Sequence, residues 1–322
     1  MRIFFTLIFL SLFTILPAQT QVEKFDSLGF HLHSIDHKNG KIEYLISKNR
    51  GEETPKPVIV FCQGSLPKPL IISTPQGIAG VFPFNHYLYD KEFRFVIISK
   101  PGIPVWPDAS QLDQQYNFLN EQSEFPEEYT QNYFMDRFVE RVNQVVKQVR
   151  KTPWCNGEII LMGHSEGARV ATKVAATNKH TNRLVYLSAN PYGRENGILL
   201  SERIKMFTGK MTGEETQNII QQRYEWFDQN NSPDHLSFSE NLMDDLLKIE
   251  KPVFVGYGTR DIGSILCDFI LLEFTKAEKT NLSFHPYVDM EHNFFMVKED
   301  GEIDYNTYNW DEVMKDVVDW VD

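Results

Sequence analysis

The sequence predicts an α/β protein, in which a mostly parallel sheet of eight strands lies between two helical layers as a three-layer α/β/α sandwich. Three observations support this prediction. Apolar runs such as residues 58–62 and 252–258 lack polar alternation, as expected of strands covered on both faces. Helical patterns separate these runs along the chain, and such alternation favours a parallel sheet. Finally, the apolar run at residues 158–162 passes through one short turn into a helix of small residues.

Composition narrows the range of functions. The chain has 322 residues, enough for one large domain or two smaller ones. Its 42% apolar and 24% charged residues are typical of soluble globular proteins. The formal net charge of -12 argues against nucleic acid or an anionic membrane surface as a partner. The acidic residues are spread along the chain, so solubility is their simplest role.

The first 18 residues resemble a secretory signal peptide. Arg2 provides a short positive region, residues 3–16 form an apolar core, and Pro17-Ala18 suits cleavage before Gln19. The alternative is an uncleaved membrane anchor, for which the apolar run is short. We therefore expect export to the periplasm or the extracellular space, a domain over residues 19–322, and no integral membrane association after cleavage.

The first half of the domain supplies five of the strands. Two alternating segments flank Asn39-Gly40, which predicts a hairpin with a tight turn. Buried strands follow at residues 58–62 and 93–99. Residues 132–151 have apolar side chains at helical spacing, and the fifth strand begins at Glu158.

The second half continues the alternation after one interruption. A sixth strand is expected at residues 184–189. Residues 191–250 then contain helical patterns and no strand pattern, with a capping box at Thr212 and Glu215, so we expect a helical cap inserted over the site. Its aromatic residues either face a pocket or pack the cap onto the body; they are Tyr224, Trp226 and Phe227. The remaining elements are expected as strands at 252–258 and 282–288 and helices at 264–276 and 310–321.

The candidate functional residues follow the ends of predicted strands. Gly163-His164-Ser165-Glu166-Gly167 lies between a strand and a helix, where two glycines allow the two elements to approach each other. Ser165 would then stand at a helix N-terminus, which favours developing negative charge. Ser65, Asp261 and His292 follow three other predicted strands. In parallel sheets, functional residues lie at the edge formed by the carboxyl ends of the strands.

The sharp turn at residues 163–167, between a strand and a helix, is called the elbow below. With this elbow and the chain order Ser165, Asp261, His292, the sequence resembles the α/β-hydrolase superfamily over nearly all of the mature chain. The resemblance implies that Ser165 is the nucleophile, His292 its base and Asp261 the acid that orients the base. It also implies an oxyanion hole from the N–H of Glu166 and that of Ser65, with Gly64 or Leu66 as alternatives to Ser65. Neither a metal nor an organic cofactor is implied.

Several alternatives remain open at this stage. His285 competes with His292, and Asp268 and acids in the cap compete with Asp261, but none of these follows a strand end. His164 is expected to pack rather than to act as a second base. The side chain of Glu166 either points to solvent, serves a neighbouring group, repels anionic substrates or binds a substrate amine. At most one disulfide can form among Cys62, Cys155 and Cys267, and no Cys/His spacing resembles a zinc site.

The predicted function is that of an exported serine hydrolase that cleaves carboxylic esters through an acyl-enzyme. A peptidase of the same fold is the first alternative, because the same triad serves both reactions, so the substrate is a small ester or a short peptide. A binding protein that kept the fold without catalysis is the second. Acyl size and oligomeric state are not fixed by the sequence.

Overall fold

The computed structural model describes residues 25–51, 54–75, 77–79, 82–229 and 236–321. The predicted signal peptide therefore lies outside the described residues. The central sheet has eight strands in the order β1-β2-β6-β3-β7-β8-β9-β10, and only β1–β2 and β2–β6 pair antiparallel. The prediction of a mostly parallel, eight-stranded sheet is confirmed. The strands are β1 (Phe30–Ile35), β2 (Ile42–Ser47), β3 (Lys56–Cys62), β6 (Arg94–Ile98), β7 (Cys155–His164), β8 (Arg183–Leu187), β9 (Val253–Gly258) and β10 (Leu282–Tyr287).

Successive residues of the central strands point into two separate cores. In β7, Ile159 and Leu161 face one core, whereas Ile160 and Met162 face the other. The side-chain period of two explains this division, because both faces of a parallel sheet are covered. The continuous apolar runs in the sequence are the result.

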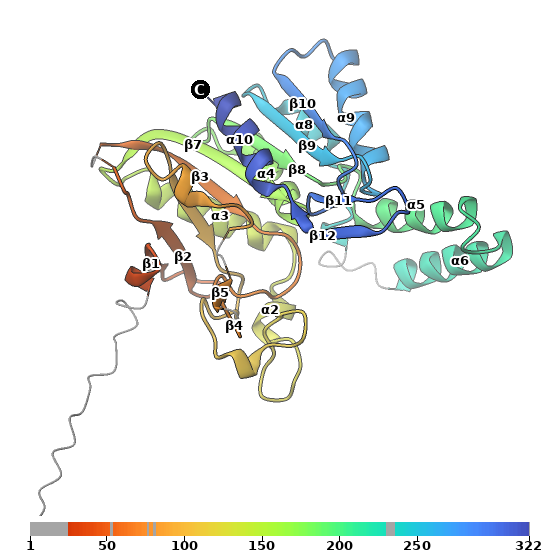
Figure 1. The fold of residues 1–322 in the computed structure, drawn as a ribbon, viewed down its shortest axis with the longest axis horizontal. Coiled ribbons are helices and arrows are strands. Elements are labelled where there is room, and N and C mark those ends of the chain that lie inside the picture. The colour runs from red at the N-terminus through yellow and green to blue at the C-terminus, as the bar shows by residue number, and fades with distance from the viewer. Residues whose placement is uncertain (1–24, 52–53, 76, 80–81, 230–235, 322) are drawn as a thin grey trace, which may run out of the picture.

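Helices cover each face (Figure 1). One core contains side chains of α3 (Met135–Val149), α4 (Glu166–Thr177), α8 (Met243–Lys248) and α9 (Ser264–Lys276). The other contains α10 (Trp310–Val321) together with aromatic residues of the segment that precedes β6. This is the predicted three-layer arrangement, and it leaves the carboxyl edge of the sheet for the site.

The segment between β8 and β9 is helical, as the sequence suggested. It contains α5 (Arg194–Phe207), α6 (Gly213–Gln229) and α8, and no strand occurs in its described residues. Thr212 and Glu215 form the predicted capping box, with 2.8 Å from the Thr212 N–H to the Glu215 carboxylate. In Figure 1, α5 and α6 lie side by side and extend away from the sheet as an arm.

The structure also contains short elements that the sequence did not reveal. A hairpin of β11 (Phe295–Val297) and β12 (Ile303–Tyr308) follows His292, and β4 (Ile72–Thr74) pairs with β5 (Gly77–Ala79). The remaining short helices are η1 (His86–Leu88), η2 (Ala109–Gln111) and α2 (Glu127–Gln131). Elements of three to six residues with mixed polarity carry too little periodicity to be recognised.

Two further expectations can be compared with the structure. Cys62, Cys155 and Cys267 are all free, and Cys62 is buried at the end of β3. Within the described residues, no helix is both long enough and apolar enough to span a bilayer.

Candidate active site

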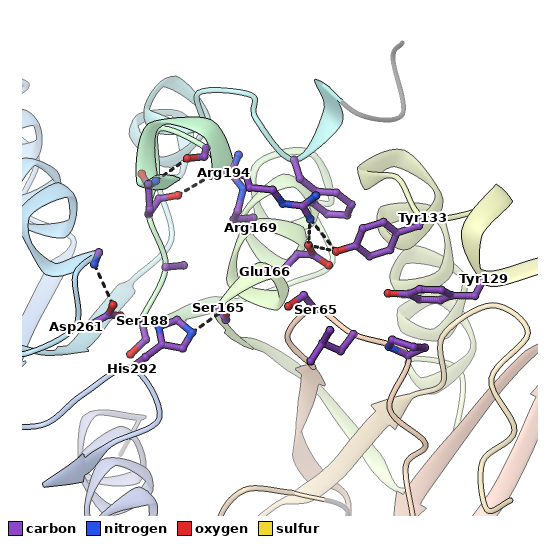
Figure 2. Close-up of a pocket in the computed structure, with 18 of the residues that line it drawn as sticks. Ser65, Tyr129, Tyr133, Ser165, Glu166, Arg169, Ser188, Arg194, Asp261 and His292 are labelled. Atoms are coloured by element: carbon purple, nitrogen blue, oxygen red, sulfur yellow. Dashed lines mark hydrogen bonds and ion pairs between the residues drawn. The ribbon is translucent and has the colours of Figure 1, made fainter. Parts of the chain in front are cut away.

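A cavity of about 810 Å³ lies at the carboxyl edge of the sheet, where β3, β7, β8, β9 and β10 end. All five residues expected from the sequence line it: Ser65, Ser165, Glu166, Asp261 and His292. In Figure 2, His292 and Asp261 lie on one side of Ser165, and Ser65 and Glu166 lie on the other. The fold thus brings together residues from four strand ends.

The turn from β7 into α4 holds Ser165 in a strained conformation. Its φ of 56° and ψ of -127° are rarely adopted by a residue with a side chain. A methyl group on Gly163 would lie 2.3 Å from the Gly167 carbonyl oxygen, and one on Gly167 would lie 1.9 Å from that of Cys62. Only glycine fits at both positions, so the close approach expected from the sequence is present.

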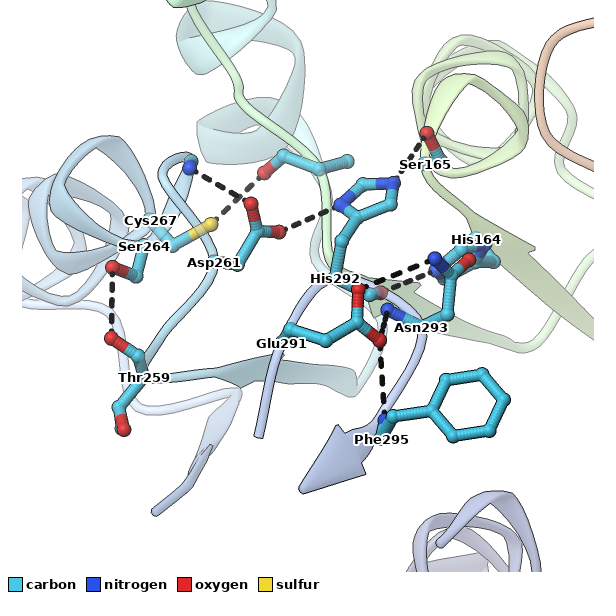
Figure 3. Close-up of polar contacts among 12 residues, drawn as sticks. His164, Ser165, Thr259, Asp261, Ser264, Cys267, Glu291, His292, Asn293 and Phe295 are labelled. Atoms are coloured by element: carbon cyan, nitrogen blue, oxygen red, sulfur yellow. Dashed lines mark hydrogen bonds and ion pairs between the residues drawn. The ribbon is translucent and has the colours of Figure 1, made fainter. Parts of the chain in front are cut away.

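A chain of two hydrogen bonds connects the nucleophile candidate to a carboxylate (Figure 3). His292 Nε2 lies 3.0 Å from Ser165 Oγ, and His292 Nδ1 lies 2.7 Å from Asp261 Oδ2. The other oxygen of Asp261 accepts the Gly263 N–H at 2.9 Å. A carboxylate accepts the Nδ1 proton, so Nε2 is free to accept the proton of Ser165.

The surroundings of His292 favour a basic imidazole. Burial alone would lower the pKa of His292, but the hydrogen bond and the charge of Asp261 and the charge of Glu291 outweigh it, so the pKa is raised above its usual value. Glu291 also shapes the loop, because its carboxylate accepts the N–H of Asn293 at 2.6 Å and that of Phe295 at 3.1 Å (Figure 3).

His164 is a buried partner of the same loop. Burial lowers its pKa to about 3, so the ring is neutral. Its Nε2 lies 2.8 Å from the His292 carbonyl oxygen, which can only accept, so His164 donates. The expectation that His164 packs and does not act as a second base agrees with this geometry, and the hydrogen bond to the His292 backbone is an addition to it.

The oxyanion-hole candidates lie beside Ser165. Glu166 is the first residue of α4, so its N–H has no acceptor inside the helix. Among the described residues, the Ser65 N–H also has no hydrogen-bond acceptor. Gly64, the alternative on one side of Ser65, does not line the cavity, whereas Leu66 does, with a positive φ of 76°.

The side chain of Glu166 does not point to solvent, contrary to one of the expectations above. It is only 10% exposed. Its carboxylate accepts hydrogen bonds from Tyr133 Oη at 2.5 Å and from Arg194 Nη2 at 2.7 Å, and the same Arg194 atom lies 2.7 Å from Tyr133 Oη. Figure 2 shows these three side chains on the wall of the cavity. The charge of Glu166 is therefore already paired by a residue at the start of the inserted segment.

The cap aromatics do not follow the expectation that they face the pocket. Tyr224 and Trp226 are 54% and 37% exposed, and Phe227 is half-buried. None of the three lines the cavity. Among its described residues, the inserted segment contributes to the cavity through its base, with Gly193, Arg194, Gly197 and Phe238.

The sequence reasoning missed three cations near the elbow. Arg194 pairs with Glu166, Arg169 lines the cavity from α4, and Lys100 lies buried two positions after the end of β6. A signal existed for Lys100, because it follows a strand end like Ser65 and Asp261. The pairing of Arg194 with Glu166 joins residues far apart in the chain, and no local pattern indicates it.

The alternative base and acid, His285 and Asp268, have other contacts. His285 stacks on Phe254 with ring centroids 4.2 Å apart, and Asp268 accepts the Tyr257 hydroxyl. The described residues contain no group of three or more His, Cys, Asp or Glu side chains arranged to hold a metal ion.

Known proteins with related folds include both esterases and peptidases. The 2,6-dihydroxy-pseudo-oxynicotine hydrolase superposes with a TM-score of 0.51 at 15% identity, covering 84% of this chain and 66% of its own. Porphyromonas gingivalis dipeptidyl peptidase 4 superposes with a TM-score of 0.52 at 12% identity, covering 82% of this chain and 32% of its own. Est1E from Butyrivibrio proteoclasticus superposes with a TM-score of 0.53 at 12% identity, covering 90% of this chain and 97% of its own.

These comparisons bear on the fold. The chain spans about two thirds and one third of the first two structures and nearly all of the third. No curated protein matches the sequence. The model of the dienelactone hydrolase family matches residues 105–322, which include Ser165, Asp261 and His292. Because this match spans more than half of the chain, the protein belongs to the dienelactone hydrolase family and has the α/β-hydrolase fold.

Proposed function

We propose that the protein is an exported serine hydrolase that cleaves carboxylic esters through an acyl-enzyme. The observation that carries this proposal is the line of contacts from Ser165 Oγ to His292 Nε2 at 3.0 Å and from His292 Nδ1 to Asp261 Oδ2 at 2.7 Å. A serine hydroxyl is a weak nucleophile, and a neighbouring base is what activates it.

Acylation begins with attack of Ser165 Oγ on the ester carbonyl carbon. His292 Nε2 takes the hydroxyl proton, and Asp261 stabilises the resulting imidazolium. The carbonyl oxygen becomes an oxyanion, which the N–H groups of Ser65 and Glu166 stabilise. Loss of one such donor typically raises the barrier by about 2.7–4 kcal/mol.

Collapse of this intermediate breaks the bond to the leaving alkoxide, which takes the proton from His292 and departs as an alcohol. A water molecule then gives a proton to His292 and attacks the acyl carbon. The second tetrahedral intermediate releases the carboxylic acid, and Ser165 Oγ recovers its proton. Each step uses the same base and the same oxyanion site.

The cavity walls favour an ester over the N-terminus of a peptide. An aminopeptidase needs a carboxylate to bind the substrate ammonium. The acidic residues that line the cavity within the described chain are Glu166 and Asp261. Arg194 pairs with the first at 2.7 Å and His292 with the second at 2.7 Å, so both carboxylates already have cationic or N–H partners.

Labelling by a fluorophosphonate tests the nucleophile. We expect the wild-type protein to be labelled and Ser165→Ala to remain unlabelled. Ser264→Ala, which changes a half-buried serine near Asp261, should be labelled like wild type. We also expect hydrolysis of p-nitrophenyl acetate to exceed that of aminoacyl-naphthylamides. An unlabelled wild-type protein would contradict the serine mechanism, and faster naphthylamide cleavage would favour the peptidase.

Export is proposed from the N-terminal sequence alone. We expect the full chain, expressed in a bacterium, to accumulate outside the cytoplasm with Gln19 as its first residue. N-terminal sequencing of the fractionated protein tests this. A cytoplasmic protein that retains Met1 would refute export without affecting the proposed chemistry.

A further inference from the structure

Lys100 is a buried cation behind the oxyanion loop. The residue is 3% exposed and lies two positions after the end of β6. Its ammonium group donates to two backbone carbonyls, those of Gly64 and Leu66. Within the described chain it forms no ion pair with a carboxylate. Burying a charge without a carboxylate partner is costly, so the position calls for a specific role.

The two carbonyls belong to the loop that carries Ser65. In a trans peptide, the carbonyl of one residue and the N–H of the next point in opposite directions. When Lys100 binds the Gly64 carbonyl, the Ser65 N–H must therefore point away from Lys100. Ser65 lines the cavity, and its N–H has no acceptor among the described residues.

The same loop is held against the elbow. A methyl group on Gly64 would lie 3.4 Å from Ser165 Cβ and 3.6 Å from the His164 carbonyl oxygen. Leu66 has a positive φ of 76°, an uncommon conformation for a leucine that needs support from its surroundings. The contact of Lys100 with the Leu66 carbonyl supplies such support on the side away from the cavity.

We propose that Lys100 is a positioning residue for the oxyanion hole, which fixes the Gly64–Ser65 peptide so that the Ser65 N–H faces the carbonyl oxygen of the substrate. The proposal rests on the serine hydrolase function proposed above. The cation also lies at the carbonyl end of this peptide, so it polarises the peptide and strengthens the N–H as a donor to an oxyanion. Lys100 acts through the peptide and does not itself touch the substrate.

The charge state of Lys100 gives this role a pH dependence. Burial lowers the pKa of Lys100 to about 8, against the opposing effect of the Glu166 charge and with a further contribution from Lys68. A further cation, Arg141 of α3, donates to the carbonyl of the adjacent Ser99 at 2.8 Å. Above this pH the amine is neutral, so the polarisation of the peptide is lost. Activity is expected to fall there.

Kinetics of Lys100→Met test the proposal, with p-nitrophenyl acetate as the probe. We expect kcat and kcat/KM to fall together by about 10- to 100-fold, because the interaction matters only when the oxyanion forms. The matched control is Lys68→Met, the same substitution in the same loop, for which both constants should stay within about twofold of wild type, as for most surface substitutions. Thermal unfolding of each variant establishes that it is folded.

The pH profile separates positioning from a purely structural role. The wild-type kcat should decline above about pH 8, and Lys100→Met should lack this decline. Lys100→Arg, which stays charged throughout, should restore part of the rate and also lack the decline.

The outcomes are distinguishable. A wild-type protein that neither reacts with a fluorophosphonate nor hydrolyses the probe overturns the proposed function and this inference with it. A labelled, active wild type with an equally active Lys100→Met variant overturns this inference alone. Were Lys100→Met unable to fold, a wild-type kcat that stays constant up to pH 10 would overturn it.

Discussion

At the scale of single residues, the position of His292 depends on three neighbours with different roles. Asp261 binds its Nδ1 atom, and His164 binds its backbone carbonyl at 2.8 Å. Glu291 orders the following turn by accepting two backbone N–H groups. The imidazole is thus held from its side chain and from its backbone, which keeps Nε2 within reach of Ser165.

Glu291→Gln should shift the acidic limb of the pH profile to lower pH. The carboxylate raises the pKa of His292, although burial opposes it, and the imidazole must be neutral to act as a base. The amide oxygen of glutamine can still accept the two backbone N–H groups, so the change removes charge and keeps the turn. The measurement is kcat/KM between pH 4 and 8.

Glu302→Gln is the control, since this exposed acid lies on the neighbouring hairpin and is not among the charges that act on His292. An acidic limb that stays in place, or one that moves to higher pH, in Glu291→Gln would show that the charge of Glu291 does not tune the base.

At the scale of elements, the β7–α4 elbow is defined by how closely three backbones meet. Gly167 lies against the end of β3, and the next residues of that strand lead into the loop with Ser65. The distance between α4 and β3 therefore also sets the distance between Ser165 and the loop that carries the Ser65 N–H. Local sequence predicts this element well because its requirement for glycine is local.

Gly167→Ala should lower the free energy of unfolding by about 3 kcal/mol or more, since a methyl group would lie 1.9 Å from the Cys62 carbonyl oxygen and only backbone can move away. Urea denaturation measures the change. Gly213→Ala, at a helical glycine whose methyl group would lie 3.8 Å from Met206 Sδ, should be neutral or slightly stabilising. Equal stability of Gly167→Ala and wild type would refute this account of the elbow.

At the scale of the whole molecule, the predictable features and the unpredictable ones have different physical origins. The strands, their parallel arrangement and the gathering of Ser165, Asp261 and His292 follow from apolar patterning and from the rule that strand ends share an edge. The pairing of Glu166 with Arg194 and the outward direction of the α5–α6 arm depend on contacts between distant segments. Sequence periodicity carries no information on such contacts. The cap could therefore be predicted as helical, but its direction relative to the sheet could not.

The base of the inserted segment is joined to the body by a compact neck, formed by residues 190–194 and 237–242. Across it, the Arg194 N–H donates to the Phe238 carbonyl at 2.9 Å, and the Leu242 N–H donates to that of Pro191 at 2.8 Å. Arg169 of α4 binds both halves, donating to the carbonyl of Asn190 at 2.6 Å and to that of Glu240. One buried side chain thus connects the elbow helix to the beginning and the end of the insertion.

Arg169→Met should loosen the neck. Hydrogen bonds from a charged donor contribute about 1.5–3 kcal/mol each, so losing two should lower the free energy of unfolding by about 3–6 kcal/mol. Local opening should also let chymotrypsin cleave at Tyr192 and Phe238, of which Phe238 is only 1% exposed in the intact fold. Mass spectrometry of the fragments identifies the sites. Arg203→Met, on the arm and outside the neck, should leave cleavage at these two residues unchanged, and equal cleavage in both variants would show that Arg169 does not hold the neck together.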